Sequence, residues 1–336
     1  MTAARKILAK GGLAGKILLL LFSASLVGEF LVPYGYNDVR FDLSYAPAIF
    51  PEMTTSGIIV PVLEQVDPVT RSYRPVPGKT ARVHFFCRGD RYHLFGIFPS
   101  DRHLVCADSP GRISFLGSDA LGRDLFSRLV IGMRLSFLLS LFGVAISFLF
   151  GVTAGLVSGY WGGWIDSVIM RTGEVFMAIP SLYLLMGFRA LFPPGIPSGE
   201  AALVITGALA LVGWAGLARV IRGVTMSLVR EDYILAARAS GATPREIFIN
   251  HLLPNMSPYL VVAVTLSVPG FIVGEAGLSF LGLGIAPPHP SLGNMLADAQ
   301  SLTVMRTAPW LLVSGFLVVL LVLLFNRLGD HIREND

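Results

Sequence analysis

Long apolar segments constrain the fold of this chain more than any other feature of its sequence. In the hydrocarbon of a bilayer every backbone polar group must be bonded within the protein, so an apolar segment of about 20 residues favours a membrane-spanning helix. Of the 336 residues, 53% are hydrophobic and 14% are charged, whereas about 25% are charged in a soluble domain. The segments that fit a span are Ile17–Val32, Leu135–Val157, Val168–Phe192, Ala201–Val220, Pro258–Val273 and Pro309–Phe325. We therefore predict an all-α polytopic membrane protein with six transmembrane helices.

The distribution of Lys and Arg predicts the orientation of these helices, because cytoplasmic loops are enriched in positive charge. The segments placed inside contain Arg5, Lys6, Lys10, Lys16, Arg171, Arg222, Arg230, Arg238, Arg245, Arg327 and Arg333, and the short outer loops contain Arg306. Both termini are therefore predicted in the cytoplasm. Ile17–Val32 has the outline of a signal peptide, but no convincing cleavage site follows it, and we predict an uncleaved first helix.

The sequence changes character between the first two apolar segments. Tyr34–Arg112 is rich in proline, aspartate, arginine and aromatic residues, with short stretches of β-type composition separated by turn signals. We predict a small β-rich domain on the extracytoplasmic side, inserted between helices 1 and 2. Cys87 and Cys106 both lie in it. We favour a disulfide, because that compartment is oxidising, while free thiols and a metal site with nearby histidines are alternatives.

The predicted organisation has four parts. They are a cytoplasmic N-terminus with the first helix (1–33), the β-rich insert with an interfacial segment (34–133), a transmembrane core (134–328) that contains a cytoplasmic hairpin (228–255), and a cytoplasmic tail (329–336).

A polar segment, Glu231–Asn255, lies between two apolar segments and predicts a helical hairpin. Tyr233–Ala239 contains good helix formers, and Gly241 suits the C′ position because glycine adopts positive φ without steric cost. The start pattern of a second helix follows, with an N-cap, a proline at N1 and a capping-box carboxylate at Thr243, Pro244 and Glu246. Pro254 is expected to end this second helix. A capped hairpin of this kind offers a fixed surface to a cytoplasmic partner.

This hairpin resembles the EAA loop of ABC importer permeases, whose pattern is Glu-Ala-Ala, three residues, Gly, nine residues, Ile, one residue, Leu-Pro. The matching positions are Ala236, Ala237, Gly241, Leu253 and Pro254. Leu235 replaces the usual Glu and His251 the usual Ile, which is similar to the dipeptide/oligopeptide/nickel branch of the family. The resemblance implies that these residues seat in a groove of an ATPase subunit. The alternative is an ordinary amphipathic cytoplasmic loop.

Further stretches resemble the same branch in the same order. Phe115–Phe137 is similar to its Gly-Thr-Asp-x-x-Gly-Arg-Asp-x-x-Ser-Arg signature, and it predicts a polar interfacial helix before the second span. We expect its charges to form structural ion pairs, with a substrate role for Arg123 or Asp124 as the alternative. Glu275–Leu296 and the tail Asn326–Arg333 resemble two other signatures of the branch.

Three features within the spans are candidates for function. A smooth face for close helix packing, against this chain or a partner subunit, is formed by Gly151, Gly155 and Gly159. Pro269 and Gly270 are expected to break the fifth helix, which makes them candidates for lining a pathway. Glu275 is an acid in the membrane zone, where a pathway or gating role and a buried helix cap are equal alternatives.

The sequence contains no Gly-x4-Gly-Lys-Ser/Thr phosphate loop, no His-Glu-x-x-His helix and no Gly-x-Ser-x-Gly elbow. We therefore predict that this chain is not an enzyme and binds no metal or cofactor directly. A basic run interleaved with aromatic residues is also missing, so we do not expect nucleic acid as a partner.

The resemblance implies a non-catalytic transmembrane permease subunit with the ABC type I importer fold, in the inner membrane of a bacterium. It implies a second homologous permease, two ABC ATPase domains that carry ATP and Mg, and an extracytoplasmic substrate-binding protein as partners. Di- or oligopeptides are the implied substrates, and nickel, opines or oligosaccharides are alternatives. A rival from another class is an ion-gradient-driven transporter or a membrane receptor that acts without an ATPase.

Overall fold

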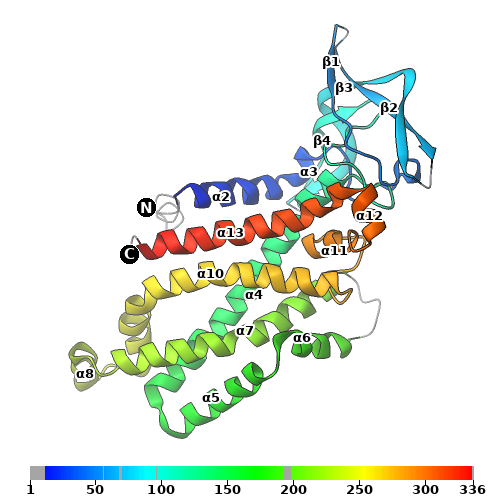
Figure 1. Cartoon of the computed structure of the whole chain (residues 1–336). Coiled ribbons are helices and arrows are strands. Elements are labelled where there is room, and N and C mark those ends of the chain that lie inside the picture. The colour runs from blue at the N-terminus through cyan, green and yellow to red at the C-terminus, as the bar shows by residue number, and fades with distance from the viewer. Residues whose placement is uncertain (1–11, 56, 68–69, 96, 193–197, 335–336) are drawn as a thin grey trace. The chain divides into compact units, whose positions relative to one another are not determined.

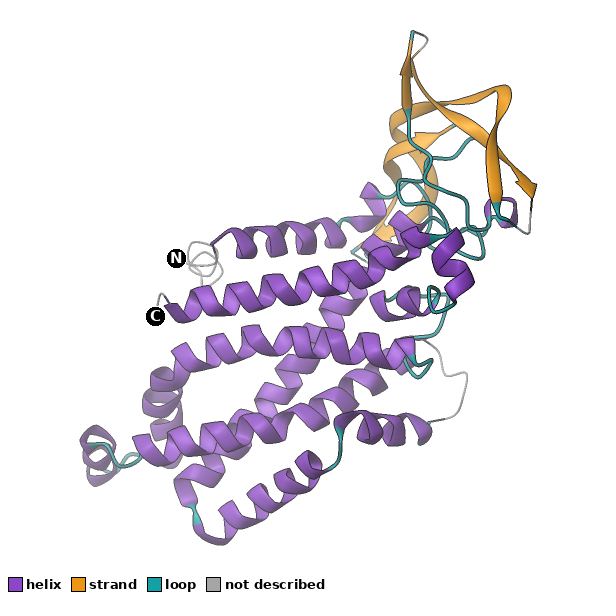
Figure 2. Ribbon diagram, in the orientation of Figure 1, coloured by secondary structure: helices purple, strands orange, loops and turns teal. Residues whose placement is uncertain are grey.

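The computed structural model describes residues 12–55, 57–67, 70–95, 97–192 and 198–334, and it combines long helices with one β-sheet (Figures 1 and 2). The helices are α2 (Gly12–Leu26), α3 (Gly28–Leu31), α4 (Leu125–Trp161), α5 (Gly163–Ala178), α6 (Ser181–Ala190), α7 (Ser198–Leu228), α8 (Asp232–Ala239), α9 (Pro244–Ile247), α10 (Leu253–Phe280), α11 (Leu292–Ala297), α12 (Leu302–Thr307) and α13 (Val313–Glu334). The strands are β1 (Glu52–Thr54), β2 (Gly57–Asp67), β3 (Ser72–Leu94) and β4 (Phe98–Ala107). The basic residues 1–11 and residues 193–197, between the third and fourth predicted spans, lie outside the described residues.

Four helical stretches in the described chain are long and apolar enough to cross a membrane: Leu125–Trp161, Gly199–Leu228, Pro244–Phe280 and Pro309–Glu334. The pair α5 and α6 adds a fifth if it is one span, although it bends by 91° at its break. The predicted first span corresponds to α2 and α3, and α2 has 15 residues, which is shorter than a span requires. The structure therefore has four or five candidate spans, and the sixth stays a prediction.

The start of α4 differs from the predicted interfacial helix. Residues 117–124 form a turn, in which Gly117 and Gly122 have φ of +79° and +71°. The Asp119 carboxylate accepts the backbone N–H groups of Leu121 and Arg123, at 2.9 and 3.0 Å. This local bonding competes with a helix. Asp124 then caps α4 by accepting the Ser127 N–H at 2.8 Å, so the helix begins ten residues before the apolar segment does.

One proline has less effect on α10 than the sequence predicts. Pro269 lies inside α10, which continues through Gly270 to Phe280 without the expected break. A proline removes a single backbone N–H from a helix, and packing within a membrane protein makes up for that loss. Pro180, in contrast, lies at the 91° bend between α5 and α6, where a proline in a helix is expected to produce a kink.

The chain divides into two compact units by its internal contacts. One comprises the described parts of residues 1–16, 139–278 and 321–336, and the other comprises residues 17–138 and 279–320. The division cuts through four of the helices, α2, α4, α10 and α13. The two units are defined by packing. The predicted domain limits instead separate cytoplasmic, transmembrane and extracytoplasmic parts of the chain, and they stay predictions.

The sheet belongs to the second unit. It is antiparallel throughout, in the order β1-β2-β3-β4, so each strand pairs with its neighbour along the chain. One face packs on an apolar core made of Ile49, Val60, Ala81, Val83, Val105 and Ile113. The proline-containing residues 60–67 and 72–80 lie in β2 and in the first half of β3. Cys87 on β3 and Cys106 on β4 are joined in a disulfide.

The glycine face of α4 packs against α7 of the same chain. A Cβ atom at Gly155 would lie 2.6 Å from the Ile221 Cβ and 2.7 Å from the Ala218 carbonyl oxygen. Gly151 and Gly159 approach α7 in the same way. The face therefore serves packing within one subunit, and in the structure its partner is α7 instead of a second subunit.

We expect the change Gly155→Ala to destabilise this unit by about 1–3 kcal/mol, because the added methyl group pushes two packed helices apart. Gly207→Ala on α7 is the matched control, since no described atom lies within 4 Å of a Cβ placed there. The measurement is the thermal unfolding midpoint of both variants in the same detergent. Equal midpoints for the two variants would contradict the close α4–α7 packing.

Candidate functional site

The polar hairpin between α7 and α10 has the turn geometry that its residues predict. Gly241 has φ of +86°. The Gly241 N–H donates to the Arg238 carbonyl and the Ala242 N–H to the Ala237 carbonyl, both at 3.0 Å. These two bonds form a Schellman motif, which closes the end of α8 and requires a residue that tolerates positive φ.

The second arm of the hairpin begins with a complete capping box. The Glu246 N–H donates to the Thr243 hydroxyl at 3.3 Å, and the Thr243 N–H donates to the Glu246 carboxylate at 2.7 Å. Pro244 occupies the first helical position, where its missing N–H costs nothing. Both ends of the central turn are therefore held by local bonds.

The end of this second arm differs from the prediction. Pro254 does not stop the helix, because α9, the π-helical turn Phe248–Leu252 and α10 form one continuous helix, Pro244–Phe280. Pro254 lies inside this helix, just after the π-helical turn, and local π adjustments of this kind let a helix in a membrane protein accommodate a missing N–H. The consequence is mechanical, since the second arm of the hairpin is a direct extension of a membrane-spanning helix.

The hairpin packs against α4 and α7 through a shared apolar cluster. The fully buried members of this cluster are Leu156, Ile221, Ile234, Ile247, Leu252 and Met256. Two of them are from α4 and α7, one is from α8, and the rest are from the second arm. Around the cluster, the Tyr160 ring lies 5.1 Å from the Phe248 ring, and the Arg238 guanidinium lies over Tyr160 at 4.4 Å. Cation–π and edge-to-face contacts of this kind add to the apolar packing.

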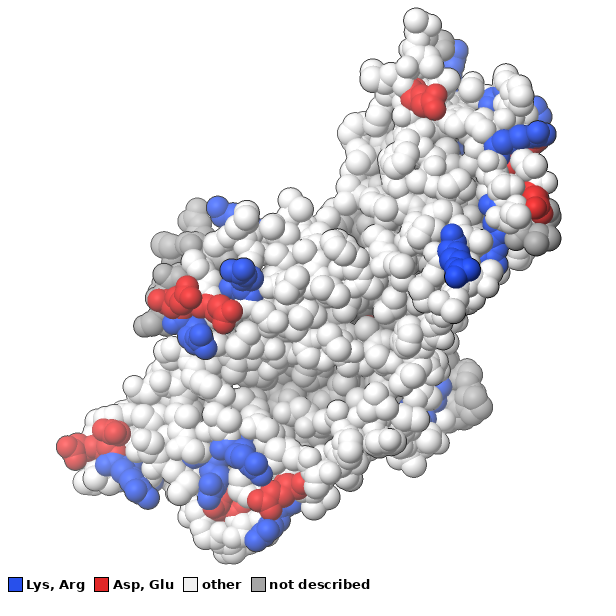
Figure 3. Space-filling model, viewed as in Figure 1, with Lys and Arg blue, Asp and Glu red and all other residues white. Residues whose placement is uncertain are grey.

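The residues predicted for ATPase coupling share one region of this hairpin but differ in exposure. Leu235, Ala236, Gly241 and Pro254 are exposed, whereas Ala237, His251 and Leu253 are partly buried. Leu235, with 49% of its surface exposed, is a large apolar side chain on the outer side of α8. Figure 3 shows charged side chains gathered over α8 and around α5 on this face, next to a largely uncharged surface over the helices. An exposed apolar side chain on a rigid, charged element is what a docking surface requires.

Sequence reasoning missed an ion pair beside the hairpin. Arg222 of α7 donates to both carboxylate oxygens of Asp166 on α5, at 2.5 and 2.6 Å. The Ser158 hydroxyl of α4 also bonds to this carboxylate. One carboxylate therefore ties three helices together. The sequence offered only a weak signal, an acid shortly after the second apolar segment and an arginine at the end of the fourth.

An apolar cavity of about 610 Å³ lies among α4, α6, α7 and α10. Four side chains with hydroxyl groups lie in its otherwise apolar wall: Ser147, Ser181, Tyr259 and Ser267. Gly270 leaves part of that wall open, since no described neighbour lies within 4 Å of a Cβ placed there. Of the predicted pathway residues, Gly270 therefore lines this cavity, while Pro269 is buried beside it. Glu275 is 2% exposed, lies within α10 before its last turn and does not line the cavity.

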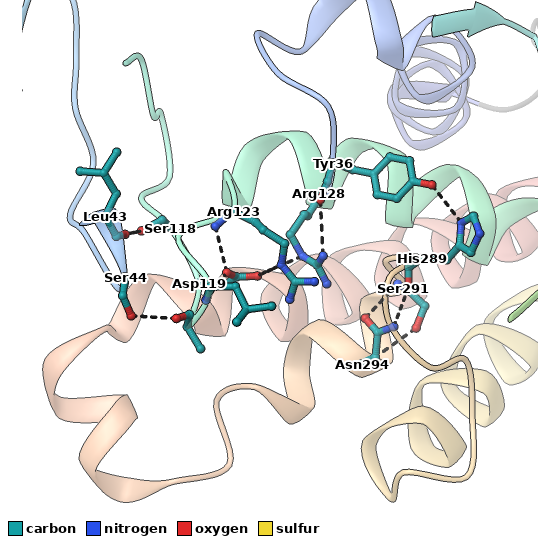
Figure 4. Close-up of polar contacts among 12 residues, drawn as sticks. Tyr36, Leu43, Ser44, Ser118, Asp119, Arg123, Arg128, His289, Ser291 and Asn294 are labelled. Carbon is teal, nitrogen blue, oxygen red and sulfur yellow. Dashed lines mark hydrogen bonds and ion pairs between the residues drawn. The ribbon is translucent and has the colours of Figure 1, made fainter. Parts of the chain in front are cut away.

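The second unit contains a buried polar cluster built from the Phe115–Phe137 signature (Figure 4). The Arg123 side chain donates to the Asp119 carboxylate at 2.7 Å, and the Arg128 Nε lies 3.4 Å from the same carboxylate. All three side chains are almost fully buried. The expected structural ion pair is thus present. Asp124 is separate from it, bonded to Ser114 and Ser127, and burial raises the pKa of its carboxyl group above the ordinary value.

The second signature meets this cluster from α11. Ser291 and Asn294 cap α11 reciprocally, with the Asn294 N–H donating to the Ser291 hydroxyl at 3.2 Å. The Asn294 amide also donates to the Ile285 and His289 carbonyls, which fixes the proline-rich loop (Figure 4). The Trp310 Nε1–H donates to the Ser118 carbonyl at 3.0 Å. The Leu292 N–H also donates to the Ser136 hydroxyl at 3.5 Å, and Leu125 and Met295 share one apolar core, so the two signatures are in contact inside the second unit.

Comparison with known proteins identifies the family. The binding-protein-dependent transport system inner membrane component family matches residues 151–334. The dipeptide transport system permease protein DppC of Alkalihalophilus pseudofirmus is 37% identical over 70% of this chain and 74% of its own length. The oligopeptide transport system permease protein OppC of Haemophilus influenzae is 38% identical over 66% of this chain and 68% of its own. An inward-facing structure of the MetNI methionine ABC transporter is similar over 61% of this chain and 95% of that chain, at 24% identity and a TM-score of 0.48.

The matched residues contain the hairpin, the buried apolar cluster under it and the lining of the cavity except Ser147 and Phe148, and the family match covers more than half of the chain. The relatives agree with it over at least two thirds of their own lengths. This chain therefore belongs to the family of binding-protein-dependent transport system inner membrane components.

Proposed function

We propose that this chain is a permease subunit of an ATP-driven ABC importer for di- or oligopeptides. In this proposal it forms half of the translocation pathway, with six spans in the type I importer fold and both termini in the cytoplasm. A second homologous permease, two ABC ATPase domains and an extracytoplasmic binding protein complete the importer. The peptide class is supported by the names of similar proteins, which include dipeptide, oligopeptide and glutathione permeases.

The hairpin from α8 to the π-helical turn is the observation that supports coupling to an ATPase. Its two arms are joined by a turn with caps on both sides, and it packs on buried side chains of α4 and α7. Its first arm follows α7 after a short turn, and its second arm is continuous with α10. A partner that displaces the hairpin therefore displaces α4, α7 and α10 together, and the Asp166–Arg222 pair adds α5.

Three of the helices that would be displaced, α4, α7 and α10, also line the apolar cavity. In the proposed mechanism ATP closes the ATPase pair, the hairpin moves, and these helices change the side on which the cavity opens. A ligand shifts such an equilibrium only by its different affinities for the two states. The serine hydroxyls and the exposed glycine backbone would then meet the peptide groups of a passing substrate, and the side chains of different peptides would meet an apolar wall.

Reconstitution into proteoliposomes tests the proposal. With the second permease, the ATPases and the binding protein present, we expect uptake of labelled di- and oligopeptides that requires ATP and is unaffected by a protonophore. Nickel, opines and oligosaccharides serve as competing substrates. Uptake by this chain alone, or uptake that a protonophore abolishes, would instead support an ion-gradient transporter. Uptake of nickel or sugars in place of peptides would keep the importer and reject the peptide substrate.

A further inference from the structure

The turn between β3 and β4 presents large apolar side chains to the surroundings of the protein. Phe95 is 50% exposed, Ile97 is 71% exposed and Phe98 is 61% exposed. Three such side chains around one tight turn are unusual for a surface in water, where contiguous apolar patches mark an interaction site. We name Phe95, Ile97 and Phe98 the hairpin tip.

The β3–β4 hairpin is fixed to the end of the first apolar segment. His103 of β4 bonds through Nδ1 to the Val32 carbonyl at 2.7 Å, and the Phe86 and Phe30 ring centroids lie 6.2 Å apart. The Gly35 N–H donates to the Asp90 carboxylate at 3.2 Å. These contacts orient the hairpin against α3 and the residues that follow it, all within the second unit.

A cavity of about 560 Å³ shows what lies beside the tip. His93 and Phe95 line it together with Leu26 of α2 and with Leu135 and Leu138 of α4. Leu135 and Leu138 lie in a helix that is long and apolar enough to span a membrane. Leu138 is 45% exposed, so it belongs to the surface that α4 would present to lipid. Through Phe95 the tip therefore adjoins this surface of α4, across a cavity that the Glu29–Arg134 ion pair also lines.

The charges near the tip fit the same surroundings. Exposed arginines flank it on both strands, Arg91 on β3 and Arg102 on β4, whereas Arg88 on β3 is paired with Asp101 at 3.9 Å. Aromatic rings at the level of the lipid headgroups, with arginines close to phosphate, are typical of segments at a membrane–water interface. A groove for a protein would instead be expected to bury the apolar side chains between polar rims.

We propose that the hairpin tip lies in the interfacial region of the bilayer. Phe95, Ile97 and Phe98 insert at the boundary between headgroups and acyl chains, and the flanking arginines contact lipid phosphate. The sheet is thereby held against the membrane surface at one corner. This proposal requires only that the chain is a membrane protein, and it does not depend on the transported substrate.

Tryptophan quenching by brominated lipid tests this directly. The full chain would be reconstituted in bilayers of phosphatidylcholine and phosphatidylglycerol, with or without bromine on the acyl chains, as the parent and as the Phe98→Trp and Phe95→Trp variants. The chain has four tryptophans, so the emission of the parent is subtracted. We expect bromine to lower the added emission about twofold or more, because both positions lie at the acyl boundary.

Met53→Trp is the matched control. Met53 is 88% exposed and lies on β1, a strand that Figure 1 shows at the end of the sheet away from α3. Its added emission is expected to be the same in both lipids. Unquenched emission at both tip positions would overturn the proposal, and so would equal quenching in the Met53→Trp variant. If the emission of the Phe95→Trp and Phe98→Trp variants is the same in both lipids but its wavelength shifts when the binding protein is added, the surface binds a protein partner instead.

Discussion

Replacing Gly241 with valine is expected to abolish most ATP-driven transport while the chain still inserts into the membrane. Gly241 has φ of +86°, and the Schellman bonds at the end of α8 depend on that conformation. A residue with a Cβ costs about 1–2 kcal/mol there, and a β-branched one costs most. Among the described residues, no atom lies within 4 Å of a Cβ at this position, so the effect arises from backbone strain and not from a clash.

The size of the effect should follow the tolerance of each residue for positive φ. We expect transport to fall in the order Gly241, Gly241→Asn, Gly241→Asp and Gly241→Val, with the last reduced by about tenfold or more, because 1.4 kcal/mol corresponds to a factor of ten. The measurements are ATP-dependent peptide uptake and the amount of ATPase subunit that co-purifies with the chain. Both should fall together, since a distorted hairpin presents Leu235 and Ala236 in the wrong place.

Gly223→Ala on α7 is the control for this series. Gly223 has ordinary helical geometry, and no described atom lies within 4 Å of a Cβ placed there. Alanine is the better helix former by about 1 kcal/mol, so this variant should transport as the parent does. Normal uptake by Gly241→Val would show that the hairpin does not transmit force from an ATPase.

Replacing Asp119 with asparagine is expected to have the largest effect on stability. Asparagine has the shape of aspartate, but it removes the charge and replaces one acceptor oxygen by an NH₂ donor. That donor would face either the two arginines or the Leu121 and Arg123 N–H groups, all of which are donors themselves. Arg123 and Arg128 would then remain buried without the carboxylate that contacts both. Breaking a buried ion pair by removing one partner costs about 3–5 kcal/mol, which is a large share of a total stability of about 5–15 kcal/mol. The measurement is the yield of folded protein and its thermal unfolding midpoint in detergent.

A surface pair in the same unit supplies the comparison. Asp101 lies 3.9 Å from Arg88, and their side chains are 43% and 79% exposed. Because exposed pairs contribute little, Asp101→Asn should cost less than about 1 kcal/mol. The double variant Asp119→Asn with Arg128→Met removes both partners of one buried pair. Its loss of unfolding free energy should therefore be smaller than the sum of the losses in the two single variants. If Asp119→Asn and Asp101→Asn lowered the thermal unfolding midpoint by similar amounts, the ion pairs of Asp119 would not be buried as the structure shows.

The parts of this protein that could be predicted are those set by neighbours along the chain. Gly241 ends α8 and Thr243 caps the next helix because both roles depend on bonds within a few residues. The resemblance to the EAA loop was carried by the same short segment, and the family match agrees with it. Apolar length likewise identified the four longest spans, since a helix is the structure that satisfies its own backbone in lipid.

The extent of each helix was decided by tertiary structure. Pro254 and Pro269 have the local chemistry of helix breakers, and α10 nevertheless continues through both. The glycine face of α4 carries no information about its partner, and only the fold brings it against α7. Asp166 and Arg222 are 56 positions apart in sequence, so no local pattern joins them. Bonds between neighbouring residues can be recognised in one dimension, whereas the packing that offsets a lost bond or pairs two distant charges exists only once the helices have assembled.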